Sequence, residues 1–264
     1  MLIVIIPIGG IGQRFKDHQF PFPKSLTLVQ CKPILFYLID NIITHQQKPS
    51  HIIIPYHNEY QEYLFEQQIK HTYPGINFIF LPLQYNTLGA AHTIYLGLSH
   101  IKQLNIPDSP FISFDSDSFY KQDILKLWDK KNTIFYTNDS GNIPQYSYIK
   151  INDKNNTIDD IQEKKSITKN ACTGTYAFDS YQMFLKHFEL YIQSIKNNNE
   201  IYVSQIIKFM ISNKIKFYSQ FISSNNWICL GTPQQVLSYC NTHSPNTTMR
   251  ICYDLDNTLV TFPT

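Results

Sequence analysis

Short apolar runs alternate with longer segments of helical pattern through the first 130 residues of the chain. The apolar runs, rich in β-branched and aromatic residues, are typical of buried strands and lie at 2–8, 51–55, 77–81 and 111–114. Segments with a helical pattern lie between them at 33–43, 58–71 and 87–101. Strands that alternate with helices predict an α/β fold with a parallel sheet built from βαβ units.

The second half of the chain is richer in strands. We expect strands at 133–136, 146–150, 173–178 and 216–222, and helices at 181–196 and 201–211. The expected arrangement is one continuous α/β domain over residues 1–243, in which a mixed-sheet insertion lies over a ligand cleft. In parallel sheets that cleft lies at the carboxyl ends of the strands.

Composition and charge exclude several classes of protein. The chain has 264 residues, 43% of them hydrophobic, and a formal net charge of +2, so nucleic acid and anionic membranes are not expected partners. No stretch approaches the roughly twenty apolar residues of a membrane span, and no secretory signal is recognisable. Five cysteines without a C-x-x-C pair indicate reduced thiols and a cytoplasmic protein. The sequence leaves the oligomeric state open, a homo-oligomer included.

The first strand leads into the run G-G-I-G-Q-R-F at 9–15, which is followed by P-K-S-L at 23–26. Glycines let the backbone approach a ligand closely, and successive N–H groups can cradle phosphate oxygens. Arg14 and Lys24 add positive charge on either side. The pattern predicts a site for a multiply charged phosphate ester. A plain glycine turn with two solvated basic side chains is the alternative.

This pattern differs from the dinucleotide fingerprint and from the P-loop in its glycine and lysine spacing. It resembles the signature of the sugar-phosphate nucleotidyltransferases, the nucleotide-sugar pyrophosphorylases: G-G-x-G-x-R, a spacer, then P-K-P-L, with Ser25 at the second proline. The resemblance covers residues 1–240 and implies a Rossmann-like, mostly parallel or mixed sheet of the nucleotide-diphospho-sugar transferase type. It also implies catalytic roles for Arg14 and Lys24, and a nucleotide seated on the backbone of Gly9, Gly10 and Gly12.

Gln84 and the run N-T-L-G-A-A-H-T at 86–93 resemble the element of that family that contacts the base. The resemblance implies that Gln84 binds the base edge and that the Gly89 backbone lies beside it. A side-chain amide offers both a donor and an acceptor, which suits a pyrimidine. A helix start with small packing residues is the alternative.

Asp115-Ser116-Asp117 follows the fourth expected strand. Mg²⁺ prefers oxygen ligands and usually takes one or two carboxylates together with phosphates and waters. The resemblance implies Mg²⁺ as cofactor, with Asp117 as the catalytic metal ligand and Asp115 as the second candidate. A solvated turn is the alternative, because Asp and Ser are common turn residues.

Three further elements resemble the family in their order along the chain. Glu163-Lys164 resembles the pair that holds the sugar and its phosphate. Gly174 resembles the glycine of a strand that lines the sugar pocket, and Glu200 resembles the acid of an E-x-Y-x-T/S segment near the sugar. The resemblance therefore implies that these four residues bind the substrate.

The run W-I-C-L-G-T-P at 227–233 resembles the closing W-x-D-x-G-T-P element, with Cys229 in place of an aspartate that often binds a second metal. A thiol is a poor Mg²⁺ ligand, so we expect Cys229 to be a small buried residue. Asp254 and Asp256 resemble the first motif of haloacid-dehalogenase-like phosphatases. At 244–264 we therefore expect a linker and the start of an incomplete phosphatase domain, without phosphatase activity.

The resemblance implies a Mg²⁺-dependent nucleotidyltransferase. A sugar phosphate, or a similar phosphate monoester, would attack the α-phosphorus of a nucleoside triphosphate and release pyrophosphate. Gln84 favours CTP, UTP or dTTP, and the product would be a nucleoside-diphosphate sugar for glycan or capsule synthesis. Two alternatives stay open: a glycosyltransferase that uses a ready-made nucleotide sugar, and a catalytically weak nucleotide-sugar-binding protein.

Overall fold

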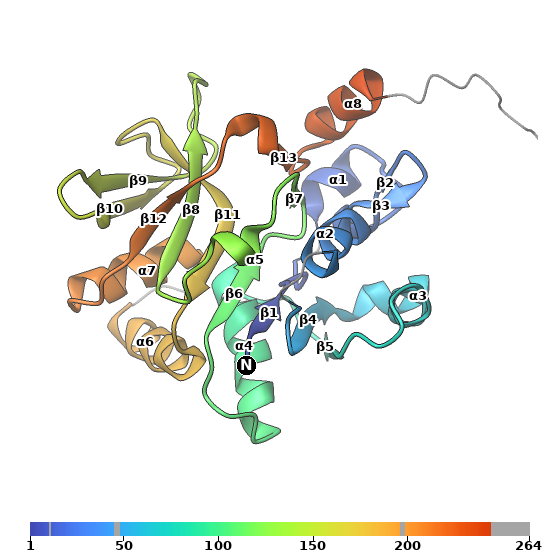
Figure 1. Cartoon of the computed structure of the whole chain (residues 1–264). Coiled ribbons are helices and arrows are strands. Elements are labelled where there is room, and N and C mark those ends of the chain that lie inside the picture. The colour runs from blue at the N-terminus through green and yellow to red at the C-terminus, as the bar shows by residue number, and fades with distance from the viewer. Residues whose placement is uncertain (11, 45–47, 196–198, 244–264) are drawn as a thin grey trace, which may run out of the picture.

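A mixed sheet runs through the molecule, with helices on both of its faces (Figure 1). The computed structural model describes residues 1–10, 12–44, 48–195 and 199–243. The strands of this sheet are β1 (Ile3–Ile5), β4 (His51–His57), β5 (Phe78–Leu83), β6 (Phe111–Phe114), β8 (Thr133–Asn138), β9 (Ser147–Asn152), β10 (Thr157–Glu163), β11 (Asn170–Phe178) and β12 (Tyr218–Phe221). Among the described residues the sheet has nine strands, in the order β5-β4-β1-β6-β11-β8-β12-β10-β9.

The first four strands of the sheet are parallel. β1 lies between β4 and β6, so that Ile3 pairs with His51 on one side and Phe111 on the other, and β5 extends this set beyond β4. β11 then runs antiparallel to β6 and to β8, and β12 runs parallel to β8. The expected α/β class, with a parallel first half and a mixed second half, is confirmed.

The helices pack on the sheet or cap its edges. They are α1 (Gln13–Asp17), α2 (Ile34–Ile43), α3 (Phe65–Thr72), α4 (Ala90–Gln103), α5 (Ile124–Leu127), α6 (Tyr181–Ser194), α7 (Val203–Ser212) and α8 (Pro233–Thr242), with short 3₁₀ turns η1 (Lys24–Leu26), η2 (Asn58–Tyr63) and η3 (Ser224–Asn226). Two small strand pairs lie outside the main sheet: β2 (Leu28–Val29) with β3 (Lys32–Pro33), and β7 (Ser118–Tyr120) with β13 (Trp227–Cys229).

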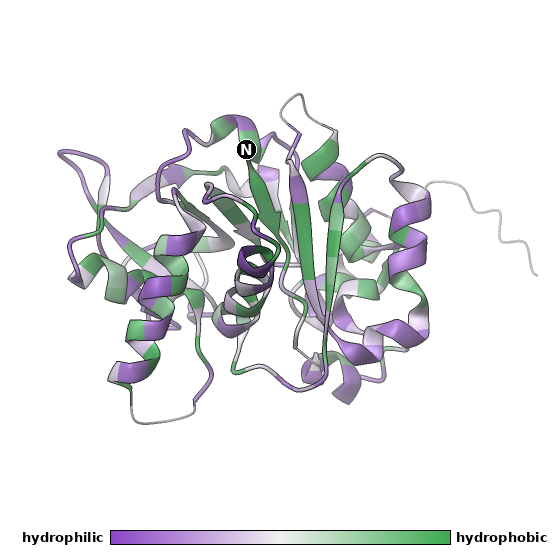
Figure 2. Cartoon of the chain, turned by 90° about the horizontal axis from the view of Figure 1, so that it is seen from below, coloured by the Kyte–Doolittle hydropathy of each residue, from purple (hydrophilic) through white to green (hydrophobic). Residues whose placement is uncertain are grey.

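Alternate residues of β1 enter two different cores. Ile3 and Ile5 pack among side chains of α4, α6 and α7, whereas Val4 packs among side chains of α2 and α3. Figure 2 shows the strands in green between helices that carry purple, hydrophilic stretches. Parallel strands covered on both faces are hydrophobic at every position, which explains the continuous apolar run at the start of the sequence.

The helix expected at 58–71 is wrong as a single element. Leu64 adopts φ +50°, which ends η2 and begins α3. The break lets Tyr60 and Phe65 turn into one aromatic cluster with Tyr56, with ring centroids 4.8 Å apart for Tyr56 and Phe65 and 5.6 Å apart for Tyr60 and Phe65. Burial of these rings outweighs the steric cost of a left-handed leucine.

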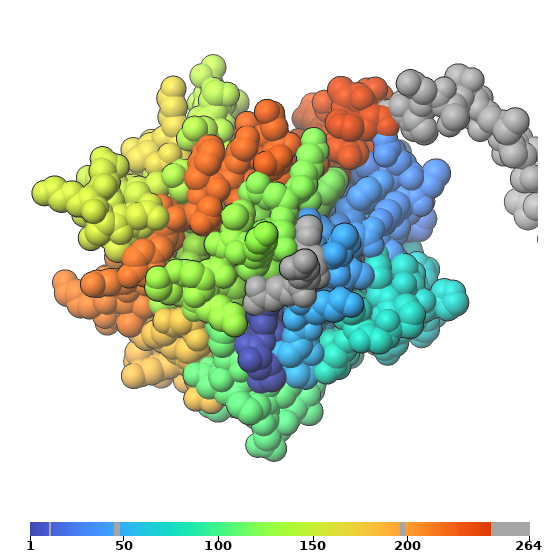
Figure 3. Space-filling view, viewed as in Figure 1, coloured from blue at the N-terminus to red at the C-terminus, as the bar shows by residue number. Residues whose placement is uncertain are grey.

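We expected a mixed-sheet insertion over the cleft. In the structure, the strands of the second half instead continue the main sheet. β11 joins it to the parallel half, because Phe178 pairs with Phe111 of β6. α6 and α7 share a hydrophobic core with α4, so they cover the same face of the sheet. The chain then returns to the first half: Val236 of α8 enters the core that contains Phe15, and α8 lies beside the N-terminal segments drawn in blue (Figure 3).

Residues 244–264, which include Asp254 and Asp256, lie outside the described residues. In the part of the chain that the structure describes, we find no helix of sufficient length and apolarity to cross a bilayer.

Gly97 allows α4 to lie close against the sheet. A Cβ atom at Gly97 would come within 2.8 Å of Ile5 Cδ1 and 3.0 Å of Pro55 Cγ. We expect Gly97→Val to lower the free energy of unfolding by about 1–3 kcal/mol through overpacking. The control Lys102→Val changes an exposed position of the same helix and should cost no more than about 0.5 kcal/mol. Equal losses in urea unfolding would contradict the proposed close packing.

Candidate active site

The carboxyl edge of the parallel strands carries several of the predicted site residues. Gly9 follows the β1 strand, Gln84 follows β5, and Asp115 follows β6. Between β1 and β6 the chain order of the sheet reverses, and ligands of open α/β sheets bind at such a position. The fold therefore brings residues from distant parts of the sequence to one edge.

Lys24 and Asp117 form an ion pair at this edge. Lys24 opens η1, and Asp117 lies in the turn between β6 and β7. Burial by itself would lower the pKa of Lys24, but the charge of Asp117 and the hydrogen bond to it outweigh burial, so the pKa is raised. Lys24 therefore keeps its positive charge at neutral pH.

Asp115 lies against the backbone of Gly174 in β11. The Asp115 N–H donates to the Gly174 carbonyl at 3.0 Å, and a Cβ atom at Gly174 would collide with the Asp115 carboxylate. Gly174 has φ +80°, a conformation that favours glycine. The pKa of Asp115 is raised by burial first and by the nearby charge of Asp117 second.

Cys229 lies beside Asp117. β13 pairs with β7 so that Cys229 faces Ser118, and a Cβ atom at Gly231 would lie 3.0 Å from Asp117 Oδ2 and 3.5 Å from Cys229 Sγ. Burial raises the pKa of the Cys229 thiol to about 11, and the thiol donates to Gln235 Oε1 at 3.8 Å. A protonated thiol of this kind has little affinity for Mg²⁺.

Two close approaches connect the glycine run to the segment after β5. A Cβ atom at Gly9 would lie 2.6 Å from Thr93 Oγ1 in α4. Gly89 has φ +112°, and a Cβ atom there would lie 2.7 Å from the Ile201 carbonyl oxygen and 3.0 Å from Glu200 Cγ. The structure thus places Gly9, Gly89 and Glu200 around the start of α4.

Glu163 and Lys164, at the end of β10, take part in two separate contacts. Glu163 Oε2 accepts hydrogen bonds from Ser147 Oγ and, at 2.7 Å, from Ser204 Oγ. Its charge also contributes to the raised pKa of Asp115, after burial and the charge of Asp117. Lys164 Nζ donates to the Tyr202 hydroxyl at 2.7 Å.

The Tyr202 hydroxyl in turn donates to Glu200. Lys164, Tyr202 and Glu200 therefore form a chain on the exposed side of the site, while the Glu163 carboxylate points to the two serines.

Other predicted residues lie at the rim. Arg14 is exposed in α1, next to Phe15, whose ring lies 6.0 Å below Lys24 Nζ. A Cβ atom at Gly12 would lie 3.2 Å from Lys24 Cβ, whereas one at Gly10 would meet no atom within 4 Å. Gln84 is exposed and its Oε1 accepts from Asn58 Nδ2 at 3.2 Å. Among these four predicted residues, Gly12 is the one that the structure brings against Lys24.

The residues present fit a Mg²⁺ ion. Asp115 and Asp117 place two carboxyl groups beside the ammonium of Lys24. Burial first, and then the charge of Asp117, raise the pKa of Asp115 to about 8, so a bound cation would favour the ionised form of this carboxyl group. Among the described residues no group of three or more His, Cys, Asp or Glu side chains could hold a metal. Mg²⁺ needs only one or two carboxylates, because phosphates and waters supply its other ligands.

Sequence reasoning missed the hydroxyl groups of the site. Ser25 Oγ lies 2.8 Å from Ser116 Oγ, and the Tyr60 hydroxyl donates to Ser25 Oγ at 3.4 Å. One sequence feature could have pointed to this contact: Ser25 stands where the signature described above has a proline. Of the two serines that contact Glu163, Ser147 carried no signal, whereas Ser204 is the serine of the E-x-Y-x-T/S segment that begins at Glu200.

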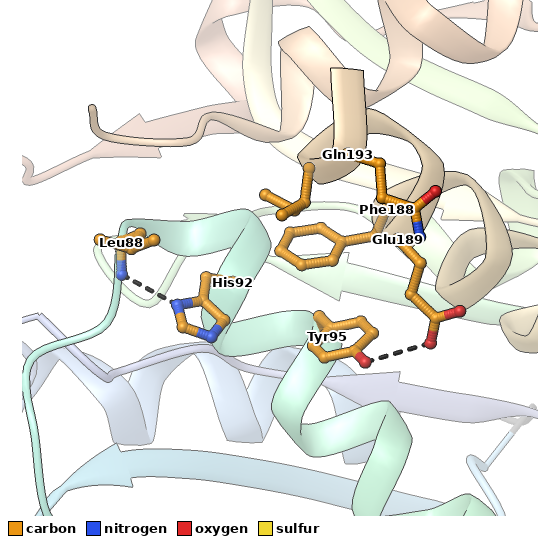
Figure 4. Close-up of a pocket in the computed structure, with 7 residues that line it drawn as sticks. Leu88, His92, Tyr95, Phe188, Glu189 and Gln193 are labelled. Carbon is orange, nitrogen blue, oxygen red and sulfur yellow. Dashed lines mark hydrogen bonds between the residues drawn. The ribbon is translucent and has the colours of Figure 1, made fainter. Parts of the chain in front are cut away.

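A separate pocket of about 320 Å³ lies between α4 and α6. His92, Tyr95 and Phe188 face one another in it (Figure 4), and the rings of Tyr95 and Phe188 stack at 4.4 Å. His92 Nδ1 accepts from the Leu88 N–H at 3.1 Å. The residues that line this pocket include none of the predicted site residues, so it is distinct from the sheet edge.

The fold is the mixed α/β fold of nucleotide-diphospho-sugar transferase structures. The nucleoside-diphosphate-sugar pyrophosphorylase from Vibrio cholerae RC9 superposes with a TM-score of 0.78 at 18% identity, covering 90% of this chain and 99% of that chain. The CTP:phosphocholine cytidylyltransferase from Streptococcus pneumoniae has a TM-score of 0.69 at 17% identity, covering 91% and 98%. The UTP-bound UGPase from Acinetobacter baumannii has a TM-score of 0.68 at 16% identity, covering 92% and 93%. No protein-family model and no curated protein sequence matches the chain.

Replacing Gly174 by alanine should destabilise the protein for two reasons: its positive φ and its close approach to Asp115. A control at Gly75, which has only the positive φ, separates the two effects. Gly75 has φ +83° but would meet no atom within 4 Å. We expect Gly75→Ala to lower the free energy of unfolding by about 1–2 kcal/mol. Gly174→Ala should lose about 1–3 kcal/mol more, because its methyl group displaces the Asp115 carboxylate. Similar losses for the two variants in urea unfolding would show that Asp115 does not need this space.

Proposed function

We propose that the protein is a Mg²⁺-dependent nucleotidyltransferase that joins a nucleoside triphosphate to a sugar phosphate, or to a similar phosphate monoester. The observation that carries the proposal is the Lys24–Asp117 ion pair at the carboxyl edge of the sheet, with Asp115 beside it. A lone ammonium between carboxylates suits a site where phosphate oxygens and a divalent cation meet. The solved structures of the same fold, named above, support this choice.

In the proposed reaction, an oxygen of the phosphate monoester attacks the α-phosphorus of the triphosphate. The new P–O bond forms as the bond from the α-phosphorus to the bridging oxygen breaks, and pyrophosphate leaves with that oxygen. No covalent bond to the enzyme is needed, so positioning and charge stabilisation supply the rate. Lys24 neutralises the transferring phosphoryl group, and Arg14 neutralises the triphosphate tail.

The backbone of Gly9, Gly10 and Gly12 seats the nucleotide in this proposal. Asp115 and Asp117 would hold Mg²⁺, which neutralises charge on the phosphate oxygens when bound. These roles agree with the observed approach of Gly12 to Lys24 and of Asp115 to Gly174.

Gln84 and Gly89 bind a pyrimidine base in the proposed complex. The exposed Gln84 amide carries both a donor and an acceptor. Two of the similar structures are a CTP-dependent cytidylyltransferase and a UTP-bound enzyme, which supports CTP or UTP, with dTTP as the third candidate.

The acceptor lies against Glu163, Lys164, Gly174 and Glu200 in this proposal. The product, a nucleoside-diphosphate sugar or a close analogue, would supply glycan or capsule synthesis in the cytoplasm.

A weakly catalytic nucleotide-sugar-binding protein is the second candidate. Cys229 favours it, because its protonated thiol takes the place of a carboxylate next to Asp117. Binding of triphosphate and Mg²⁺ without release of pyrophosphate would support this candidate over the enzyme.

Lys24→Ala should lower the rate of pyrophosphate release by about 10²–10³-fold, the size expected when a group that stabilises transition-state charge is removed. The assay mixes each of the five common triphosphates with sugar 1-phosphates and Mg²⁺. Lys70→Ala, an exposed lysine of α3, is the matched control and should stay within about threefold of the wild type.

A near-normal rate for Lys24→Ala would contradict the assignment. Sugar transfer from a ready-made nucleotide sugar, with no pyrophosphate released, would instead indicate a glycosyltransferase.

Asp117→Asn and Cys229→Ser should differ strongly in their effect on turnover. Removing the Asp117 carboxylate should lower turnover by about 10²-fold or more, since charge neutralisation at the phosphates depends on it. Replacing the Cys229 thiol by a hydroxyl should change turnover by less than about threefold. Mg²⁺ titrations of thermal stability with triphosphate present provide a second readout. An equal loss in Cys229→Ser would contradict the expectation that the thiol takes no part in the reaction.

A further inference from the structure

Two neighbouring residues of one loop contact two residues of the carboxylate turn. Lys24 pairs with Asp117, and Ser25 Oγ lies 2.8 Å from Ser116 Oγ. The two serines are 91 positions apart in the chain. The Lys24 loop is therefore fixed to the turn at two points, one ionic and one formed by neutral hydroxyl groups.

A buried tyrosine donates a hydrogen bond to one of the two serines. Tyr60 and Ser25 are each only 2% exposed, and the Tyr60 hydroxyl donates to Ser25 Oγ at 3.4 Å. Burial raises the pKa of Tyr60 to about 12, so this hydroxyl keeps its proton at neutral pH. Since Ser25 Oγ accepts from Tyr60, its own proton is available to donate to Ser116 Oγ.

The two contacts respond differently to a charged ligand. A phosphate competes for the Lys24 ammonium and a cation competes for the Asp117 carboxylate, so the ion pair is weakened when either binds. A hydrogen bond between neutral hydroxyls meets no such competition, and the burial of Ser25 keeps water from replacing it.

We propose that Ser25 and Ser116 form a hydroxyl clamp, which keeps the Lys24 loop against the carboxylate turn while the Lys24 ammonium engages a phosphoryl group. This inference rests on the proposed function. Ser25 and Ser116 act here as positioning residues, because they hold Lys24, Asp115 and Asp117 in place rather than contact the reacting atoms.

The kinetic test compares Ser25→Ala, Ser116→Ala and the double variant in the pyrophosphate assay. We expect each single variant to lose about tenfold in kcat with little change in KM for the triphosphate, as for the loss of one hydrogen bond in the transition state. The double variant should lose no more than the singles, because both changes remove the same contact. Ser116→Thr, which keeps the hydroxyl at a half-buried position, should recover most of the rate.

Thr27→Val is the matched control. Thr27 is 3% exposed in the same loop, and its hydroxyl donates within the loop to the Pro23 carbonyl at 3.5 Å rather than to the carboxylate turn. Its kcat should stay within about threefold of the wild type. A kcat loss in Thr27→Val as large as in Ser25→Ala would overturn the clamp in favour of a general effect on loop packing.

Amide hydrogen exchange of the full chain without substrates separates the clamp from the proposed function. The Ser118 N–H donates to the Asp115 carbonyl at 3.3 Å and reports on the carboxylate turn. Ser25→Ala should speed exchange at Ser118, and Thr27→Val should leave it unchanged.

Unchanged exchange at Ser118 in Ser25→Ala, an unchanged kcat, or multiplicative losses in the double variant would each overturn the clamp. If the wild type releases no pyrophosphate with any triphosphate, the proposed function fails, and the exchange result still decides whether the hydroxyl pair holds the two segments together.

Discussion

The site depends on one electrostatic constraint. The carboxyl groups of Asp115 and Asp117 lie together with the ammonium of Lys24 at the edge of a hydrophobic sheet. Asp115 and Asp117 repel each other, and burial of either charge is costly without a partner. Lys24 balances the charge of Asp117. Burial and the charge of Asp117 raise the pKa of Asp115 to about 8, so its protonated form is favoured at neutral pH, and a bound cation would favour its ionised form. The three groups therefore need to be held at fixed distances from one another.

The fold supplies that rigidity from three distant segments. β6 ends at Asp115, β11 passes Gly174 beneath the carboxylate, and the β7–β13 pair brings Gly231 next to Asp117. Glycine occurs where a side chain would fill the space that the carboxylates need. The same sheet that buries alternate residues of β1 in two cores thus sets the distances between charged groups that are nearly one hundred residues apart.

The sequence predicted the parts of this arrangement that depend on local pattern. The apolar runs predicted the parallel strands because burial on both faces leaves a continuous hydrophobic signature, and β6 has the predicted bounds. Gly9 and Asp115 lie at one edge because strand ends converge there, and Lys24 reaches this edge through its ion pair with Asp117. The left-handed Leu64 and the β7–β13 pair were missed, since each is decided by tertiary packing. Ser25 looked like a minor departure from the signature, and only the structure shows its contact with Ser116.

The same electrostatic constraint explains why an uncharged residue, Cys229, is compatible with the position beside Asp117. An aspartate at this position would add a negative charge beside Asp117 and raise further the electrostatic cost of ionising Asp115, a cost that a further cation would have to offset. The protonated Cys229 thiol adds no charge, because burial holds its pKa well above neutral. Relative to the signature that the sequence resembles, Cys229 therefore adds neither a carboxylate ligand nor the negative charge that a second cation would balance. Under the proposed function, Asp115 and Asp117 are a sufficient protein contribution to a single magnesium site, because the phosphates of the substrate provide the remaining oxygens.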